Sequence, residues 1–355
     1  MAQQTFEDIP AYIRTAFTPQ MREVVEHQLA RRAGLASQAS PPAEPVDPIA
    51  LAARMREDYR DERSFWNVGG PQPFRTEDLH IRAAGVDVPV RIHRPSDSDS
   101  LPAIVYFHGG GFNVGDLDTH DRITRVLADV SGAAVVSVDY SLSPEAKFPQ
   151  ALHECAGVVA QLAVNGHSFG IDPDRLAVAG DSAGAMLSVA TALLLRDDPQ
   201  SVPELPAGAA DRAFSSVRAM VLYYGGHGLA DSASARLYGG FWDDMGPADL
   251  DQPDLSPFSG PEDRRSPYVD HLSADLSAPL PSAYIIGAEL DPLADSTRAF
   301  GTLLAHHGHD VSWRIVPGVL HSFIHFGRML DEANEVLAGG AAFVRSRFEA
   351  AAPQA

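Results

Sequence analysis

The alternation of short apolar runs with helical segments constrains the fold of this chain more than any other feature. Strands that are buried on both faces appear as continuous apolar runs, and strand–helix alternation builds right-handed βαβ units. The runs lie at residues 103–107, 133–138, 176–179, 219–224, 283–286 and 311–316, and the helical segments at 118–130, 144–164, 183–196 and 295–307. The sequence therefore predicts an α/β fold with a mostly parallel sheet and helices on both faces.

Two further strands are expected at one edge of this sheet. Residues 79–82 and 86–93 alternate apolar and polar side chains, which is typical of half-buried antiparallel strands. They bring the predicted sheet to eight strands. The helix over residues 144–164 is expected to begin at Pro144, with Ser143 as its capping residue.

Helices are predicted before the first strand. Apolar residues recur at three- and four-residue steps over residues 11–34, where Gly34 is a candidate stop, and a second helix is expected over 49–63. The stretch 37–48 is rich in Ser, Ala and Pro and indicates a linker. We interpret residues 1–70 as an N-terminal helical cap segment that precedes a main domain over residues 71–355.

One stretch interrupts the strand–helix rhythm. Residues 225–275 contain no good strand and are rich in Gly, Pro, Asp and Ser. The stretch is too long for a simple connection. We predict an insertion that lies over the carboxyl edge of the sheet and meets the N-terminal helices there, completing a helical cap.

The charge of the chain restricts its partners. The 27 Lys and Arg against 47 Asp and Glu give a net charge of −20, which disfavours nucleic acid and anionic lipid. A solvated acidic surface is the plain interpretation, and adaptation to high salt is the alternative. The N-terminus lacks the features of a secretion signal and no apolar run could span a bilayer, so we expect a cytoplasmic protein without a membrane partner.

The sharpest chemical signal is Gly-Asp-Ser-Ala-Gly at residues 180–184. It follows a predicted strand and opens a predicted helix, which is the context of a nucleophile elbow. Such a turn lifts a serine hydroxyl above the sheet. Ser182 is therefore the candidate nucleophile.

A glycine-rich turn follows an earlier strand, with the sequence His-Gly-Gly-Gly-Phe at residues 108–112. Glycines allow backbone N–H groups to face a developing oxyanion without obstruction by a Cβ. The expected donors are the N–H groups of Gly109 and Gly110 together with that of Ala183. His108 is expected to order this loop rather than to transfer protons.

A base and an orienting acid should follow Ser182 in the order acid, then histidine. Asp291 and His321 each lie just past a predicted strand end, on the same side of the sheet as Ser182. We assign Asp291 as the acid and His321 as the base, with Glu289 as the alternative acid.

Other reactive residue types have simpler interpretations. The histidines at 306, 307 and 309 are expected at the surface rather than in a metal cluster, and His325 lacks the glutamate that a zinc helix supplies at this spacing. Cys155 is the only cysteine and lies on an apolar helical pattern, so it is expected to be a core thiol. No metal or cofactor is implied.

These motifs together resemble the hormone-sensitive-lipase-like family of α/β-hydrolases, and within it the bacterial acetyl esterases. The resemblance covers about residues 76–345 and rests on the motifs at 108–112, 115–122, 138–145, 180–186, 291–293 and 320–325. It implies an α/β-hydrolase core, a helical cap and hydrolysis of short-chain acyl esters. It places nucleophile, acid and base on Ser182, Asp291 and His321, and the oxyanion motif on His108, Gly109 and Gly110.

One position departs from the family pattern. Ser322 stands where the family commonly has glycine, although this removes no catalytic atom.

The leading hypothesis is thus a serine carboxylesterase that acts on acetyl to butyryl esters through an acyl-enzyme. Its partner would be a small-molecule ester, and a homodimer is a candidate assembly. The alternatives are a binding or regulatory module with this fold, or a lactonase, amidase or polysaccharide deacetylase with the same triad. Aromatic residues could line its pocket or merely pack: Phe6, Phe17, Phe241 and Trp242.

Overall fold

An eight-stranded sheet forms the centre of the protein, as the computed structural model of residues 5–36, 47–229, 231–240, 242, 245 and 253–350 shows. The spatial order is β1-β2-β4-β3-β5-β6-β7-β8. β1 and β2 pair antiparallel at one edge, β2 runs antiparallel to β4, and all other neighbours are parallel. The predicted fold class is confirmed. The strands are β1 (Arg75–Ala83), β2 (Val86–Arg94), β3 (Leu101–Phe107), β4 (Ala134–Val138), β5 (Ile171–Asp181), β6 (Val217–Tyr223), β7 (Ser282–Leu290) and β8 (Val311–Leu320).

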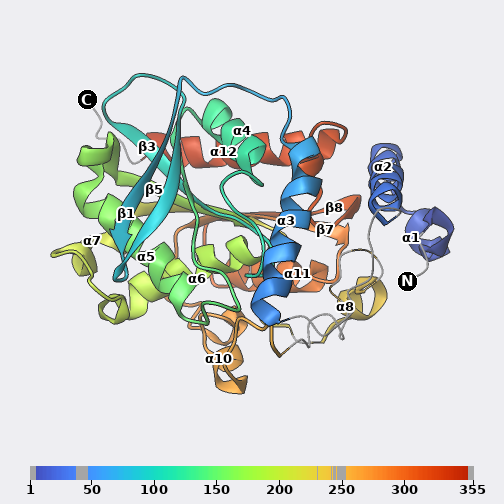
Figure 1. Cartoon of the computed structure of the whole chain (residues 1–355). Helices are drawn as coiled ribbons and strands as arrows, with labels where there is room; N and C mark the ends of the chain where they lie inside the picture. Colours follow the sequence, from blue (N-terminus) through green and yellow to red (C-terminus); the bar gives the residue numbers. More distant parts are fainter. Residues whose placement is uncertain are drawn as a thin grey trace.

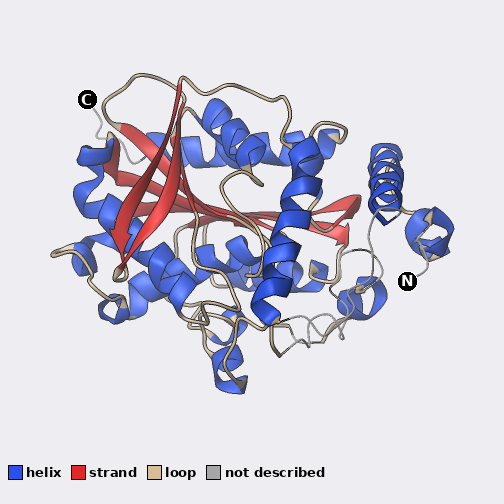
Figure 2. Ribbon diagram, in the orientation of Figure 1, coloured by secondary structure: helices blue, strands red, loops and turns tan. Residues whose placement is uncertain are grey.

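Helices cover both faces of the sheet, as Figures 1 and 2 show. One face packs against α4 (Asp121–Ser131) and α12 (Asp331–Ala350). The other packs against α5 (Gln150–Asn165), α6 (Ala183–Asp197), α7 (Ala209–Ser216) and α11 (Ala294–His306). Short 3₁₀ turns complete these connections: η2 (Gly166–Phe169), η3 (Pro199–Ser201) and η5 (Phe323–Phe326). The central strands are buried on both faces, which explains their nearly continuous apolar sequence.

The start of α5 differs from the prediction. The helix begins at Gln150, not at Pro144. Pro149 would fall inside a helix that started at Pro144, where it removes a backbone hydrogen bond and clashes with the preceding turn. The residues before it therefore form turns, and the helix starts directly after Pro149.

The N-terminal helices also differ in detail from the prediction. The expected helix over 11–34 is divided into α1 (Ala11–Arg14) and α2 (Pro19–Ala36), and Pro19 occupies the first position of α2. Gly34 does not stop α2, because a glycine inside a helix costs only about 1 kcal/mol. The turn η1 (Phe6–Asp8) precedes them, and α3 (Pro48–Trp66) is the second predicted helix. Residues 37–46 of the predicted linker lie outside the described residues.

The insertion contacts the N-terminal helices. Its described part contains α8 (Ala233–Tyr238), α10 (Pro261–Arg265) and η4 (His271–Ser273). The Tyr12 hydroxyl donates a 2.6 Å hydrogen bond to the Leu237 carbonyl oxygen, and the Arg32 guanidinium lies 4.9 Å from the centre of the Trp242 ring. These contacts place α8 beside α1 near the carboxyl ends of β7 and β8 (Figure 1).

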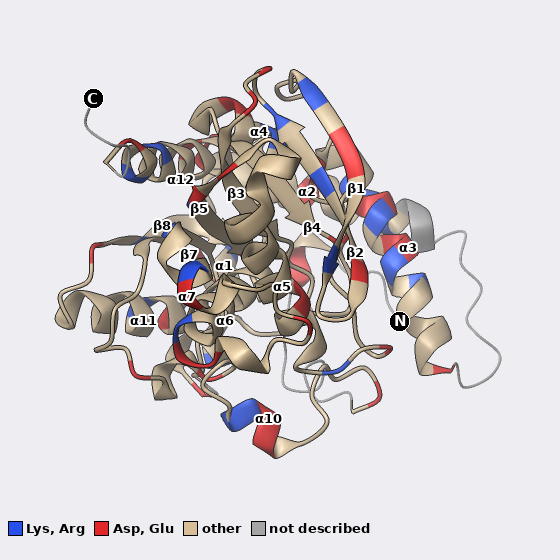
Figure 3. Cartoon of the chain, turned by 90° about the vertical axis from the view of Figure 1, so that its left-hand side faces the viewer, with Lys and Arg blue, Asp and Glu red and all other residues tan. Residues whose placement is uncertain are grey.

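Acidic and basic residues are interspersed over the surface, as β1, α3 and α10 illustrate in Figure 3. Arg91, for example, bonds to both Asp78 and Asp118 at 2.7 Å. Among the described residues, no helix combines the length and the apolar character needed to cross a membrane.

Candidate active site

A strained turn between β5 and α6 presents Ser182. Its φ of 50° and ψ of −117° are unusual for a residue other than glycine, as a nucleophile elbow requires. The Ser182 N–H donates to the Tyr223 carbonyl at 2.8 Å. A Cβ on Gly184 would lie 1.9 Å from the Phe107 carbonyl oxygen, and one on Gly180 would lie 2.4 Å from Gly184. Both flanking glycines are therefore needed for the turn to pack.

The three predicted triad residues meet at the carboxyl ends of the strands. His321 Nε2 lies 3.0 Å from Ser182 Oγ, and His321 Nδ1 lies 2.8 Å from Asp291 Oδ2. Asp291 is fully buried, and its Oδ1 accepts a 2.7 Å hydrogen bond from the Leu293 N–H. This geometry allows the imidazole to accept the serine proton while the carboxylate holds its orientation.

Glu289, the alternative acid, has a different partner. Its Oε2 accepts a 2.8 Å hydrogen bond from the Gly318 N–H and so ties the end of β7 to β8. The two carboxylates therefore have different partners: Asp291 bonds to His321, and Glu289 bonds to the Gly318 N–H.

Residues 108–112, which we call the glycine loop, are ordered by His108 and Tyr140. The Tyr140 hydroxyl donates to the His108 carbonyl at 2.7 Å, and the two rings stack with centres 4.3 Å apart. His108 Nδ1 lies 2.8 Å from the Gly109 carbonyl oxygen. Burial lowers the pKa of His108 to about 4, so its ring is neutral near neutral pH. The side chain serves the loop and does not reach Ser182.

The backbone donors differ at one position from the prediction. The Gly109 N–H donates a 2.9 Å hydrogen bond to Asp181 Oδ1, so it is already engaged within the protein. Among the described residues, no acceptor meets the N–H of Gly110 or that of Ala183. Ala183 is the first residue of α6, where N–H groups lack helical partners and the helix dipole favours an anion. Two N–H groups are thus left to receive an oxyanion.

A Cβ cannot be added to Gly110 either. It would lie 2.1 Å from the Val114 carbonyl oxygen, and the residue has a φ of 125°. The conformation that presents its N–H therefore requires glycine.

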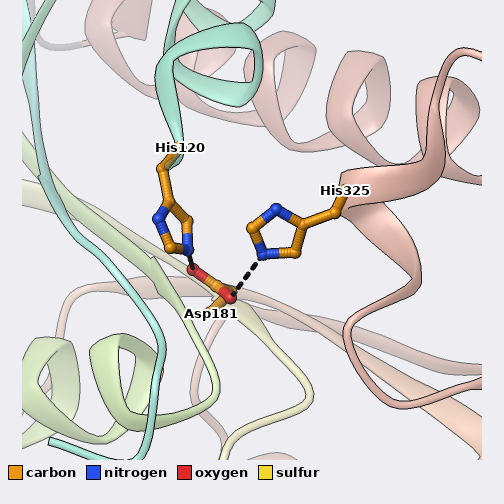
Figure 4. A group of neighbouring side chains, drawn as sticks. All are labelled: His120, Asp181 and His325. Atoms are coloured by element: carbon orange, nitrogen blue, oxygen red, sulfur yellow. Dashed lines mark ion pairs between the residues drawn. The ribbon is translucent and has the colours of Figure 1, made fainter. Parts of the chain in front are cut away.

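A polar cluster beside the nucleophile was not predicted from the sequence. His120, Asp181 and His325 are buried, and one nitrogen or oxygen from each lies within 4.8 Å of the others (Figure 4). Within the described part of the chain, this is the group that could hold a metal ion. The adjacency of Asp181 to Ser182 was the only available signal, since the two histidines are far apart in the sequence.

The remaining reactive residues lie away from the triad. His306 and His307 are exposed, and the half-buried His309 places Nε2 2.7 Å from the Leu276 carbonyl oxygen. Cys155 is buried in the core, and burial raises the pKa of its thiol well above the usual value. It is accordingly a packed, unreactive thiol.

An apolar pocket begins one helical turn beyond the nucleophile. Met186, one of its lining residues, donates its N–H to the Ser182 carbonyl at 3.1 Å, while Ser182 itself does not line the pocket. Phe112, Phe148 and Phe258 line it as well, and the ring of Phe258 lies 6.5 Å from Phe112 and 6.4 Å from Phe148, centre to centre. The glycine loop, α6 and the insertion therefore all contribute residues to the wall of the pocket.

The aromatic residues that the sequence offered as pocket walls are different ones: Phe6 and Phe17 pack on each other with ring centres 6.3 Å apart, and Trp242 is buried beneath Arg32. None of these three lines the apolar pocket. Phe241 lies outside the described residues.

Comparisons with known proteins agree on the fold. A family model described as alpha/beta hydrolase fold matches residues 104–325. The esterase of Pyrobaculum calidifontis is 33% identical with a TM-score of 0.78, covering 95% of this chain and 100% of the esterase. EstE1, a thermophilic carboxylesterase cloned from a metagenomic library, is 31% identical with a TM-score of 0.75, covering 85% of this chain and 98% of its own. An ester-hydrolase from the metagenome of Lake Arreo, complexed with a bipyridine phosphonate derivative, is 25% identical with a TM-score of 0.79, covering 94% and 99%.

Proposed function

Because the chain belongs to the α/β-hydrolase family of these esterases and is a carboxylic ester hydrolase, we propose that it cleaves short-chain acyl esters through an acyl-enzyme on Ser182. The observation that carries the proposal is the continuous set of contacts from Asp291 through His321 to Ser182 Oγ. The N–H of Gly110 in the glycine loop and the N–H of Ala183 at the start of α6 have no acceptor among the described residues.

In the first half of the reaction, Ser182 Oγ attacks the ester carbonyl carbon while His321 Nε2 takes its proton. Asp291 stabilises the positive charge of the imidazolium. The negative charge that develops on the carbonyl oxygen is received by the N–H groups of Gly110 and Ala183. The intermediate then expels the alcohol, which takes the proton back from His321.

In the second half, water attacks the acyl carbon of the ester formed with Ser182. His321 again accepts a proton, now from the water, and returns it to Ser182 Oγ as that bond breaks. The products are a carboxylic acid and the free enzyme. The steps use the side chains and N–H groups of this chain, the ester and one water molecule.

The apolar pocket supports a small acyl group. It lies one turn of α6 beyond Ser182, and the rings of Phe112, Phe148 and Phe258 narrow it. We propose that it takes the acyl chain and that these rings limit the chain to about two to four carbons. The insertion and the N-terminal helices then act as the cap that covers the ester.

A series of p-nitrophenyl esters from acetate to palmitate tests this function. We expect the highest kcat/KM at two to four carbons, and Ser182→Ala should lower kcat by about 10⁵–10⁶ in a protein that remains folded. A folded Ser182→Ala protein that loses less than tenfold would contradict the nucleophile, and a maximum at long chains would contradict the small pocket.

A further inference from the structure

Asp181 is a buried carboxylate that joins the nucleophile elbow to the glycine loop. It immediately precedes Ser182 and is 1% exposed. Its Oδ1 accepts a 2.7 Å hydrogen bond from the Tyr106 hydroxyl and a 2.9 Å hydrogen bond from the Gly109 N–H. One oxygen atom thus fixes the glycine loop at the residue that precedes the unengaged Gly110 N–H.

The same carboxylate is approached by two histidines from other segments (Figure 4). His120 precedes α4 and places Nε2 3.3 Å from Asp181 Oδ1. His325 lies in η5, four residues after His321, and places Nε2 3.7 Å from Asp181 Oδ2. The glycine loop and the segment that carries the catalytic base therefore both contact the Asp181 carboxylate.

Tyr224 provides a second connection between Asp181 and the base. Its hydroxyl lies 3.4 Å from Asp181 Oδ2, and its ring packs edge-on against the His321 imidazole with centres 4.7 Å apart. The Tyr224 backbone is held in turn by a bond from its N–H to the Ile286 carbonyl oxygen. Asp181 consequently contacts residues that touch the oxyanion donors on one side and the base on the other.

The charges around Asp181 favour its ionised form. Burial alone would raise the pKa of Asp181, but His120 and His325 outweigh it and hold that pKa well below the usual value. Burial, with the nearby Arg63 and His120, lowers the pKa of His325 despite the attraction of Asp181. An ionised carboxylate that accepts several donors makes stronger hydrogen bonds than a neutral acceptor would.

We propose that Asp181 is a positioning residue for the hydrolytic reaction: it anchors the glycine loop, the elbow and the histidine segment to one another and thereby sets the oxyanion donors. The inference rests on the proposed function and deepens it, because it names the group on which the geometry of the donors depends. Asp181 acts through Gly109, Tyr224 and His325 and touches no substrate.

A divalent metal is the rival occupant of this cluster, since two imidazoles and a carboxylate are zinc ligands. The hydrogen bonds from Tyr106 and Gly109 to Oδ1 favour an anion held by donors. Metal analysis of the purified protein separates the two. One equivalent of bound zinc whose removal and return switch activity off and on would overturn the positioning proposal.

The kinetic test uses Asp181→Ala and Asp181→Asn, with p-nitrophenyl butyrate as substrate and a trifluoromethyl ketone as inhibitor. The ketone forms a hemiketal with the serine, so its affinity reports the oxyanion donors directly. We expect Asp181→Ala to lower kcat about 10²-fold, the effect of losing an oxyanion donor, with little change in KM. Asp181→Asn keeps an acceptor for Gly109 and should recover about tenfold of that loss. The inhibition constant should rise by the same factors as kcat falls.

Glu154→Gln is the matched control. Glu154 is also 1% exposed and accepts two 2.7 Å hydrogen bonds from Ser141, but it contacts neither the glycine loop nor the histidine segment. Glu154→Gln should lower Tm, while its kcat stays within threefold of the wild-type value. If Asp181→Ala does not fold, the test compares the kcat and the inhibition constant of Asp181→Asn with those of Glu154→Gln. The positioning role requires a larger change in Asp181→Asn.

The outcomes distinguish this inference from the function on which it rests. If a fluorophosphonate probe labels the wild type but Asp181→Asn and Asp181→Ala retain kcat and inhibitor affinity, the positioning role is wrong and the esterase function stands. Equal losses in the control would also overturn it, because any buried carboxylate would then suffice. If the wild type neither labels nor hydrolyses the ester, the proposed function itself fails.

Discussion

The two regions that border the site differ in how their side chains are held. At the carboxyl ends of the strands, Asp181 and Asp291 are almost fully buried and each accepts at least two hydrogen bonds. Between the described parts of the N-terminal helices and the insertion, one hydrogen bond joins two half-exposed residues. Tyr12 and Leu237, which share one hydrogen bond, are 54% and 50% exposed.

This contrast indicates how the work of the enzyme is divided. Catalysis depends on preorganised distances, so its residues belong where burial and repeated hydrogen bonds fix them. On the proposal that the apolar pocket holds the acyl chain, the choice among esters depends on the shape of its wall, to which the insertion contributes Phe258. Variants at the strand ends should therefore change rates by orders of magnitude, whereas variants in the insertion should change which ester is preferred.

Among variants of these two regions, the largest effect is expected at the triad acid. Asp291→Asn should lower kcat by about 10⁴, because the amide favours the wrong imidazole tautomer. Glu289→Gln is the matched control two residues away. Its carboxylate bonds to the Gly318 N–H, so we expect a loss of about 1 kcal/mol of stability and nearly unchanged kcat. Steady-state kinetics and thermal unfolding measure both, and a larger kcat loss in Glu289→Gln would exchange the two assignments.

A smaller and qualitatively different effect is expected in the insertion. Phe258→Ala removes one of the three phenylalanine rings that line the apolar pocket. We expect kcat/KM for octanoate relative to butyrate to rise about tenfold, since a methylene in an apolar pocket is worth roughly 1–3 kcal/mol. The p-nitrophenyl ester series measures this ratio. A uniform loss on all esters would mean that the pocket does not hold the acyl chain.

The stability of the insertion should depend on pH through a buried histidine pair. His271 Nδ1 lies 3.1 Å from His227 Nδ1, and burial lowers the pKa of His271 to about 4. The unfolded chain, with a pKa near 6.5, binds this proton more readily than the folded protein, so the contribution is complete above pH 6.5 and is lost as pH falls toward 4. Burial also lowers the pKa of His227, which adds to the loss in the same direction.

Urea unfolding between pH 4 and pH 7 measures this dependence. In the wild type, the free energy of unfolding should fall between pH 7 and pH 4. We expect His271→Asn to make this fall smaller by up to about 3 kcal/mol. An unchanged slope would show that the pair does not titrate with unfolding.

The smallest expected effect concerns Ser322. This residue has a φ of 64°, which costs an L-residue about 1–2 kcal/mol and which glycine adopts freely. Ser322→Gly should therefore raise the unfolding free energy by about 1 kcal/mol at most, with kcat within threefold. Thermal unfolding and kinetics of the variant measure it, and a loss of stability would mean that the hydroxyl makes a compensating contact.

The predictable part of this protein follows from local sequence patterns. The buried strands are apolar throughout, and the turn that exposes Ser182 needs glycines on both sides. The sequence therefore predicted the sheet, the elbow and the three residues that meet there. The chain order and the predicted strand ends selected Asp291 and His321, with Glu289 left as the alternative acid until the contacts of the structure were known.

The parts that were missed depend on distant contacts. The cluster of Asp181, His120 and His325 joins three segments that no spacing relates. The Gly109 N–H was predicted to be an oxyanion donor. Its hydrogen bond to Asp181 was missed because the two residues are far apart in the sequence and meet only in the folded chain. The start of α5 was predicted wrongly because the capping signal at Ser143 outweighed Pro149 in the sequence interpretation, although the chain obeys the proline.

Intact-protein and peptide mass spectrometry after reaction with a fluorophosphonate identifies the nucleophile, because the reagent phosphonylates an activated serine. We expect one equivalent of label on Ser182, loss of ester hydrolysis in step with labelling, and no label on Ser182→Ala. Label on another residue, or a folded wild-type protein that hydrolyses esters without taking up label, would contradict the assignment of Ser182 as the nucleophile.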